Sequence, residues 1–156
     1  MNFYIFLIIL LGAALYCAVR ISVVDLQRRI IPDVYLFPLM LIGILLGVFF
    51  PSVLDIKAGA IGATFGYVLA ATMGVVFDWG LRKSGRKADT PIGLGDIKLI
   101  GVGGLWLGIY GLAMALVVAC LTGGLWAHVQ RQKYIPFAPF FVFGGFLSFI
   151  IGLFLL

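Results

Sequence analysis

Long apolar runs separated by short polar segments dominate this chain. The runs cover approximately residues 2–24, 34–50, 58–77, 97–130 and 136–156. A helix that crosses the roughly 30 Å hydrocarbon core of a bilayer needs about 20 consecutive apolar residues. A lipid-facing β-strand would instead alternate apolar and polar positions, and these runs are continuously apolar. The pattern therefore predicts an all-α membrane protein, a polytopic bundle of helices.

The stretch 97–130 is long enough for two helices, with a turn expected near Tyr110 and Gly111, which brings the prediction to about six transmembrane helices. Small residues also recur at four-residue spacing inside two of the runs. The pairs are Gly62 with Gly66 and Gly104 with Gly108. Such pairs let helix backbones approach closely in lipid. We expect one compact transmembrane domain over residues 1–156.

Composition agrees with a membrane location, because 63% of the residues are hydrophobic and 11% are charged. Soluble domains carry about a quarter charged residues. The basic residues lie in short loops, which is unlike the folded basic face of a nucleic-acid-binding protein. Cys17 and Cys120 fall inside apolar runs without a C-x-x-C pair, so we expect packing residues and neither a disulfide nor a zinc site. No metal or other cofactor is predicted.

The basic residues divide unevenly between the two ends of the predicted bundle. Lys57 stands alone at one end. Ten others gather at the opposite end: Arg20, Arg28, Arg29, Arg82, Lys83, Arg86, Lys87, Lys98, Arg131 and Lys133. The positive-inside rule places that end in the cytosol and both termini outside. Asp25 and Asp96 then lie at the same, cytosolic, membrane edge.

These two aspartates are the candidate catalytic residues. Asp25 closes the first apolar run and Asp96 opens the fourth, in a chain with six acidic residues and no glutamate. A carboxylate at the edge of a membrane span is costly and is by default a functional hypothesis. Two carboxylates can also share acid and base roles in hydrolysis. Taken singly, each has a simpler interpretation: Asp25 as an interfacial partner of a nearby arginine, and Asp96 as a helix N-cap.

The neighbours of the aspartates suggest how each could be presented. Gly93 and Gly95 leave room for a substrate backbone and permit positive φ angles, so that the chain could turn Asp96 inward. Pro32 prevents the first helix from continuing. Asp33 is a candidate for attracting the basic part of a substrate. Lys98 should point away from Asp96 on a helix, where it could meet lipid phosphate or tune the field of the site.

Three segments, taken in order, resemble the type IV prepilin peptidases, a family of GxGD-type membrane aspartic proteases. Residues 25–33 (DLQRRIIPD) resemble the first aspartate motif, and residues 93–99 (GLGDIKL) the second. Residues 135–140 (IPFAPF) resemble the proline-phenylalanine segment that opens the last helix, with Ala138 where glycine is commoner. Each motif is weak alone. Together with the predicted spans, the resemblance covers essentially the whole chain.

The resemblance implies that Asp25 and Asp96 form the catalytic pair of an endopeptidase in the cytoplasmic membrane. Its substrates would be prepilins or pseudopilins, proteins of type IV pili and secretion systems, with a short basic leader and an apolar helix. Larger family members carry an N-terminal cytosolic methyltransferase portion. Here the first apolar run begins at once, so the resemblance implies a short form that cleaves without methylation.

Two other functions fit part of the pattern. In an ion or proton transporter, Asp25 and Asp96 would bind a cation or relay protons, although the sequence places no partner acid deeper in the bundle. A non-catalytic assembly protein would use the glycine faces to recognise other helices. Cleavage of a prepilin-like peptide that depends on the aspartates distinguishes the peptidase from both.

Overall fold

The computed structural model describes residues 2–83, 92–131 and 135–155, and these residues form helices and short connections. The helices are α1 (Asn2–Arg28), α2 (Asp33–Phe49), α3 (Ile56–Lys83), α4 (Leu94–Gln130) and α5 (Phe137–Leu155). The predicted all-α class is confirmed for this part of the chain. By length and apolar composition α1, α3 and α4 are each able to cross a membrane, whereas α2 and α5 are shorter apolar helices.

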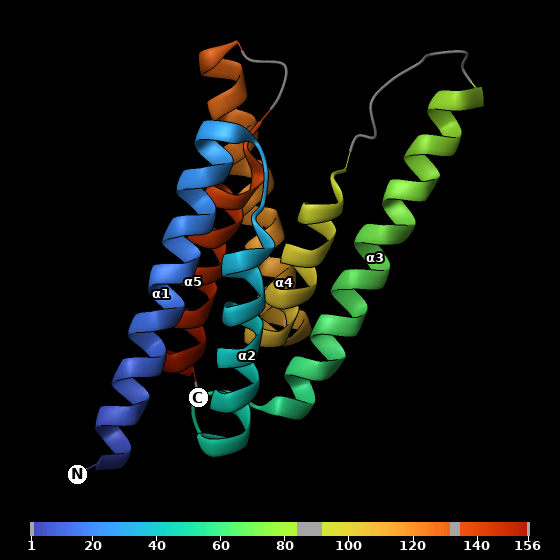
Figure 1. Ribbon diagram of the computed structural model, residues 1–156. Helices are drawn as coiled ribbons and strands as arrows, with labels where there is room; N and C mark the ends of the chain where they lie inside the picture. The colour runs from blue at the N-terminus through green and yellow to red at the C-terminus, as the bar shows by residue number, and fades with distance from the viewer. Residues whose placement is uncertain (1, 84–91, 132–134, 156) are drawn as a thin grey trace.

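A break at Gly108 divides α4 into a first half, residues 94–107, and a second half, residues 109–130. Gly108 has φ 64° and ψ −173°, and this positive φ is readily adopted by glycine alone. Contacts with α5 show the direction of each half. In the first half, Gly103 meets Phe141 and Leu107 meets Gly145, so the residue numbers rise together. In the second half, Gly123 meets Phe140 and Ala115 meets Gly144, so the residue numbers of α4 fall as those of α5 rise. The two halves therefore run in opposite directions, as Figure 1 shows. The predicted turn at Tyr110 and Gly111 was thus misplaced by two residues.

The helices pack around α4, which contacts α3, α5 and α2. The first helix, α1, contacts α2 and α5, and α2 also contacts α3. Figure 1 shows α3 leaning away from the other helices toward its C-terminal end. Four large side chains are almost completely enclosed in the core: Ile21, Leu46, Leu99 and Leu112.

Glycines set the distance between α3 and α4. A Cβ atom placed on Gly104 would collide with the backbone carbonyl of Gly62, and one placed on Gly59 would collide with that of Leu105. Both obstacles are backbone atoms, which cannot rotate away as side chains do. The close approach predicted from the glycine spacing is confirmed, and it gives α3 its van der Waals contact with α4.

The exterior of the bundle is apolar along its length. Large hydrophobic side chains are exposed on several helices, among them Tyr4, Ile8, Val75, Leu121 and Val129. Within the described residues, Asp25 and Ser148 are the polar side chains that are buried. A surface of this kind suits hydrocarbon, where helices satisfy their own backbone hydrogen bonds.

We expect the variant Gly104→Leu to lower the thermal unfolding temperature of the detergent-solubilised protein. The added side chain must push α3 away from α4, and overpacking of this kind costs about 1–3 kcal/mol or more. The matched control is Gly12→Leu on α1, because no atom lies within 4 Å of a Cβ at Gly12. Equal unfolding temperatures for the two variants would contradict the packing role of Gly104.

Candidate active site

Asp25 lies in the last turn of α1 with its side chain buried and directed at the beginning of α5. Its residue is 4% exposed, and its Oδ2 accepts a hydrogen bond from the backbone N–H of Ala138 at 2.8 Å. The backbone N–H of Phe137 and the charge of Arg29 also act on this carboxylate. Asp25 is thus held in the interior by a helix that begins more than a hundred residues later in the chain.

The sequence at the beginning of α5 explains why it offers donors to Asp25. The first N–H groups of any helix have no partner within the helix. Pro136 and Pro139 have no N–H at all, so Phe137 and Ala138 supply the free donors of this turn. Both donors face Asp25. A carboxylate at this position also meets the positive end of the helix dipole.

Asp96 lies in the first turn of α4 and is half-buried. Its Oδ2 accepts a hydrogen bond from the backbone N–H of Gly93 at 3.2 Å. Asp96 is the third residue of α4 and accepts this bond from Gly93, the N-cap residue that precedes the helix, which forms one of the two hydrogen bonds of a capping box. The second bond needs a side chain at the N-cap, and glycine has none. One carboxylate oxygen of Asp96 therefore fixes its orientation at the start of the helix.

The predicted role of the glycines in turning the chain was wrong, because neither has a positive φ. Gly93 has φ −69° and ψ 148°, an extended conformation that most residues adopt, and Gly95 lies within the helix. Gly95 instead allows a close approach: a Cβ there would lie 2.9 Å from the Cβ of Ile31. Helix α1 already ends at Arg28, where the next residue, Arg29, has φ 55°. Pro32 occupies the N-cap position of α2, so its predicted role in ending the first helix stays a prediction.

Lys98 and Asp33 form an ion pair beside the aspartates. Lys98 Nζ lies 2.8 Å and 3.0 Å from the two carboxylate oxygens of Asp33. Lys98 does point away from Asp96, as predicted. The sequence did not indicate this pairing, which joins the first turn of α2 to α4. Exposed ion pairs of this kind contribute about 0–1 kcal/mol to the free energy of unfolding. The pair therefore adds little to stability, and its main effect is to align the starts of α2 and α4.

These contacts bring Asp25 and Asp96 together from positions far apart in the sequence. The charge of Asp25 acts on the carboxyl group of Asp96 across the site. Gly95 packs against Ile31 in the connection that follows Asp25. The end of α1, the start of α4 and the start of α5 therefore meet at one end of the bundle, where the charge of one carboxyl group acts on the other.

Comparison with known proteins identifies the family. The profile of the type IV leader peptidase family matches residues 8–128, a segment that includes both aspartates. This chain belongs to that family.

Curated relatives of this chain bear the name "Prepilin leader peptidase/N-methyltransferase". The protein from Xanthomonas campestris pv. campestris is 30% identical over an alignment of 141 residues, which covers 86% of this chain and 47% of the relative. The one from Dickeya chrysanthemi is 29% identical over 92% of this chain and 51% of the relative. The chain thus spans about half the length of the curated relatives it matches. No solved structure matches it.

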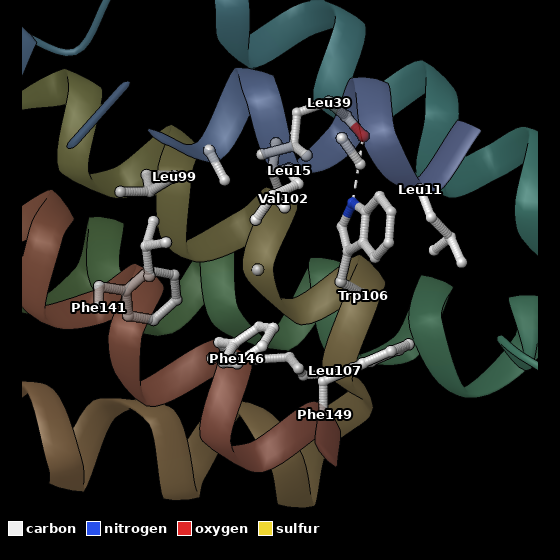
Figure 2. Close-up of a pocket in the computed structure, with 15 residues that line it drawn as sticks. Leu11, Leu15, Leu39, Leu99, Val102, Trp106, Leu107, Phe141, Phe146 and Phe149 are labelled. Atoms are coloured by element: carbon white, nitrogen blue, oxygen red, sulfur yellow. Dashed lines mark hydrogen bonds between the residues drawn. The ribbon is translucent and has the colours of Figure 1, made fainter. Parts of the chain in front are cut away.

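Two cavities lie near the helices that carry Asp25 and Asp96, and they differ in chemistry. The first measures about 330 Å³ and lies among α1, α2, α4 and α5 with an apolar lining that includes Leu15, Phe141 and Phe146. Figure 2 shows Trp106 in this cavity, where its indole N–H donates to the carbonyl of Leu39. The second cavity, of about 500 Å³, includes Asp96 in its lining. Of the two cavities, the second is therefore the one that a candidate catalytic carboxyl group lines.

Sequence reasoning identified both aspartates but missed the residues that hold Asp25. Residues 135–140 entered the prediction as a resemblance, without a contact to Asp25. The signal was present in the two prolines, which leave Phe137 and Ala138 as the free donors of the turn.

In the described segments, no three side chains of His, Cys, Asp or Glu form a group that could ligate a metal ion.

The bond between Asp25 and Ala138 predicts different stabilities for two variants. Asp25→Asn keeps an oxygen acceptor for the Ala138 N–H and should unfold at or above the wild-type temperature. Asp25→Ala leaves a buried donor without a partner and should lose about 1–3 kcal/mol. Thermal unfolding in detergent measures both. If Asp25→Ala matched Asp25→Asn, the hydrogen bond would not support the fold.

Proposed function

We propose that this chain is a membrane aspartic endopeptidase that removes the basic leader from type IV prepilins or pseudopilins. The main observation in support is that two carboxyl groups, those of Asp25 on α1 and Asp96 on α4, lie at the same end of an apolar bundle. Family membership and the names of the relatives support a leader peptidase activity. Among the described residues, the lysine nearest to the pair in the sequence, Lys98, is bound to Asp33 and not to either of the two aspartates.

The proposed mechanism uses the two aspartates as an acid–base pair. One carboxylate takes a proton from water, while the protonated partner donates a hydrogen bond to the scissile carbonyl and polarises it. The two groups then exchange roles as the tetrahedral intermediate collapses and the leaving amine takes a proton. Because they interact, they titrate as a pair rather than as two independent acids. The hydrogen bonds from Ala138 and Gly93 keep both side chains oriented through this cycle.

Replacement of either aspartate by asparagine should lower the rate of leader cleavage by about a hundredfold to ten-thousandfold, the range that a positioned acid or base supplies. The assay follows a prepilin-like peptide with a basic leader and an apolar helix in detergent or liposomes. Asp55→Asn is the matched control. Asp55 precedes α3 at the opposite end of the bundle and accepts a bond from the N–H of Lys57.

Full activity of Asp25→Asn or Asp96→Asn would refute the proposal. Ion flux that depends on Asp96, without any peptide cleavage, would support the transporter instead.

We further propose that the chain lies in the cytoplasmic membrane with about six crossings, both termini outside and the aspartates at the cytosolic face. The end of the bundle that carries Asp25 also carries the basic ends of α1, α3 and α4. The opposite end has Lys57 at the start of α3. The positive-inside rule favours this orientation, and the apolar exterior would face lipid.

Single cysteines test the orientation in a background without the native thiols. A cysteine at Ser52, between α2 and α3, should react with a membrane-impermeant thiol reagent in intact cells. A cysteine at Arg29, after α1, should react only once the membrane is permeabilised. The reverse pattern of labelling would overturn the proposed orientation.

A further inference from the structure

A cleft beside Asp96 has a structure that the catalytic pair alone does not require. It is the second cavity, of about 500 Å³, and it lies between the two halves of α4 and the start of α5. Cys120, Gly123 and Gly124 of the second half line it together with Ile100 and Phe140. We name it the Cys120 cleft. Its volume is in the ordinary range for a site that encloses part of a ligand.

The lining of the Cys120 cleft is mostly apolar. Small residues of the second half of α4 contribute to it, together with bulky apolar side chains such as Ile100 and Phe140. Phe140 packs over Gly123, whereas no atom lies within 4 Å of a Cβ at Gly124. Asp96 is the charged side chain among the described lining residues. An apolar segment of a substrate chain fits this lining. A basic leader does not, because its positive charges would have a single carboxylate as partner, Asp96, and the proposed reaction already uses that carboxylate.

The lining of the cleft extends along the chain on both sides of Asp96. Ile92 precedes Asp96 in the connection before α4, and Ile100 follows it. Ile100 lies one helical turn after Asp96, a displacement of about 6 Å toward the middle of the bundle. In the proposed substrates the apolar helix follows the scissile bond, so we place the segment after the bond in the part of the cleft next to Ile100.

We propose that the Cys120 cleft binds the apolar residues that directly follow the scissile bond, and that Cys120 and Gly124 set the size of the side chain it accepts. This proposal rests on the proposed function, because it places the substrate relative to Asp96. It adds a binding surface on the second half of α4, a segment that contributes neither aspartate. The basic leader would then extend from the opposite side of the pair, toward the polar end of the bundle.

The native cysteines provide a direct test. Cys120 is exposed and Cys17 is buried, so a thiol reagent should modify Cys120 in the folded protein. Methanethiosulfonate reagents of increasing size should lower the cleavage rate progressively, and uncleaved substrate should slow the labelling. In Cys120→Ala, which has no thiol at this position, the reagents should leave the cleavage rate at the value that this variant has before treatment. A protein that is fully labelled at Cys120 and cleaves at the unmodified rate would overturn the proposal.

A second variant tests the size limit without relying on a reagent. No atom lies within 4 Å of a Cβ at Gly124, so Gly124→Leu should fold while its side chain narrows the cleft. We expect kcat/KM to fall by about a hundredfold for a substrate with leucine after the scissile bond. The loss should be clearly smaller with alanine there. Gly12→Leu, equally free of contacts and remote from the cleft, should cleave both substrates like the wild type.

The outcomes separate this proposal from the proposed function. If the unmodified protein shows no aspartate-dependent cleavage, the proposed function fails and the cleft proposal fails with it. If it cleaves, but Gly124→Leu treats both substrates as the wild type does, the function stands and the cleft proposal is refuted. Protection of Cys120 by lipid but not by substrate would likewise refute it, since the occupant would then be an acyl chain.

Discussion

The hydrogen bond between Asp25 and the backbone N–H of Ala138 is the contact on which the arrangement of the site depends. It joins the last turn of α1 to the first turn of α5 across 113 positions of the sequence. A buried carboxylate needs donors, and the first turn of a helix has donors that need an acceptor. Each group therefore satisfies the other. The same contact supports the fold and positions a side chain for chemistry.

Asp96 reaches this site through a different set of constraints. The contact between Gly95 and Ile31 and the pair formed by Lys98 and Asp33 hold the start of α4 against the connection between α1 and α2. At the other end of its first half, α4 reverses at Gly108, so that its second half returns toward Asp96. The reversal places small residues of the second half beside the carboxyl group. A straight α4 would leave Asp96 without this neighbour.

Much of the helical architecture was readable because each signal is local. The apolar runs gave helices whose ends lie within several residues of the expected positions, and Pro32 marks the start of α2. The spacing of the glycines indicated close backbone contact, but it did not indicate that α3 and α4 are the helices that pair. The cysteines were harder to interpret: Cys17 is buried as expected, whereas Cys120 is exposed. An isolated cysteine in an apolar run does not reveal which face of its helix it occupies.

Local patterns along the chain were enough to predict that it is helical and apolar, that two aspartates stand at the ends of apolar runs, and that the basic residues accompany them. These features follow from composition and from the period of the helix, which depend on nearby residues. The packing of the helices was needed to find that Ala138 holds Asp25, that Lys98 pairs with Asp33, and that Gly95 serves packing rather than a turn. Each of these contacts joins different helices. Their partners depend on how whole helices are placed and rotated, and that information is not contained in any single segment.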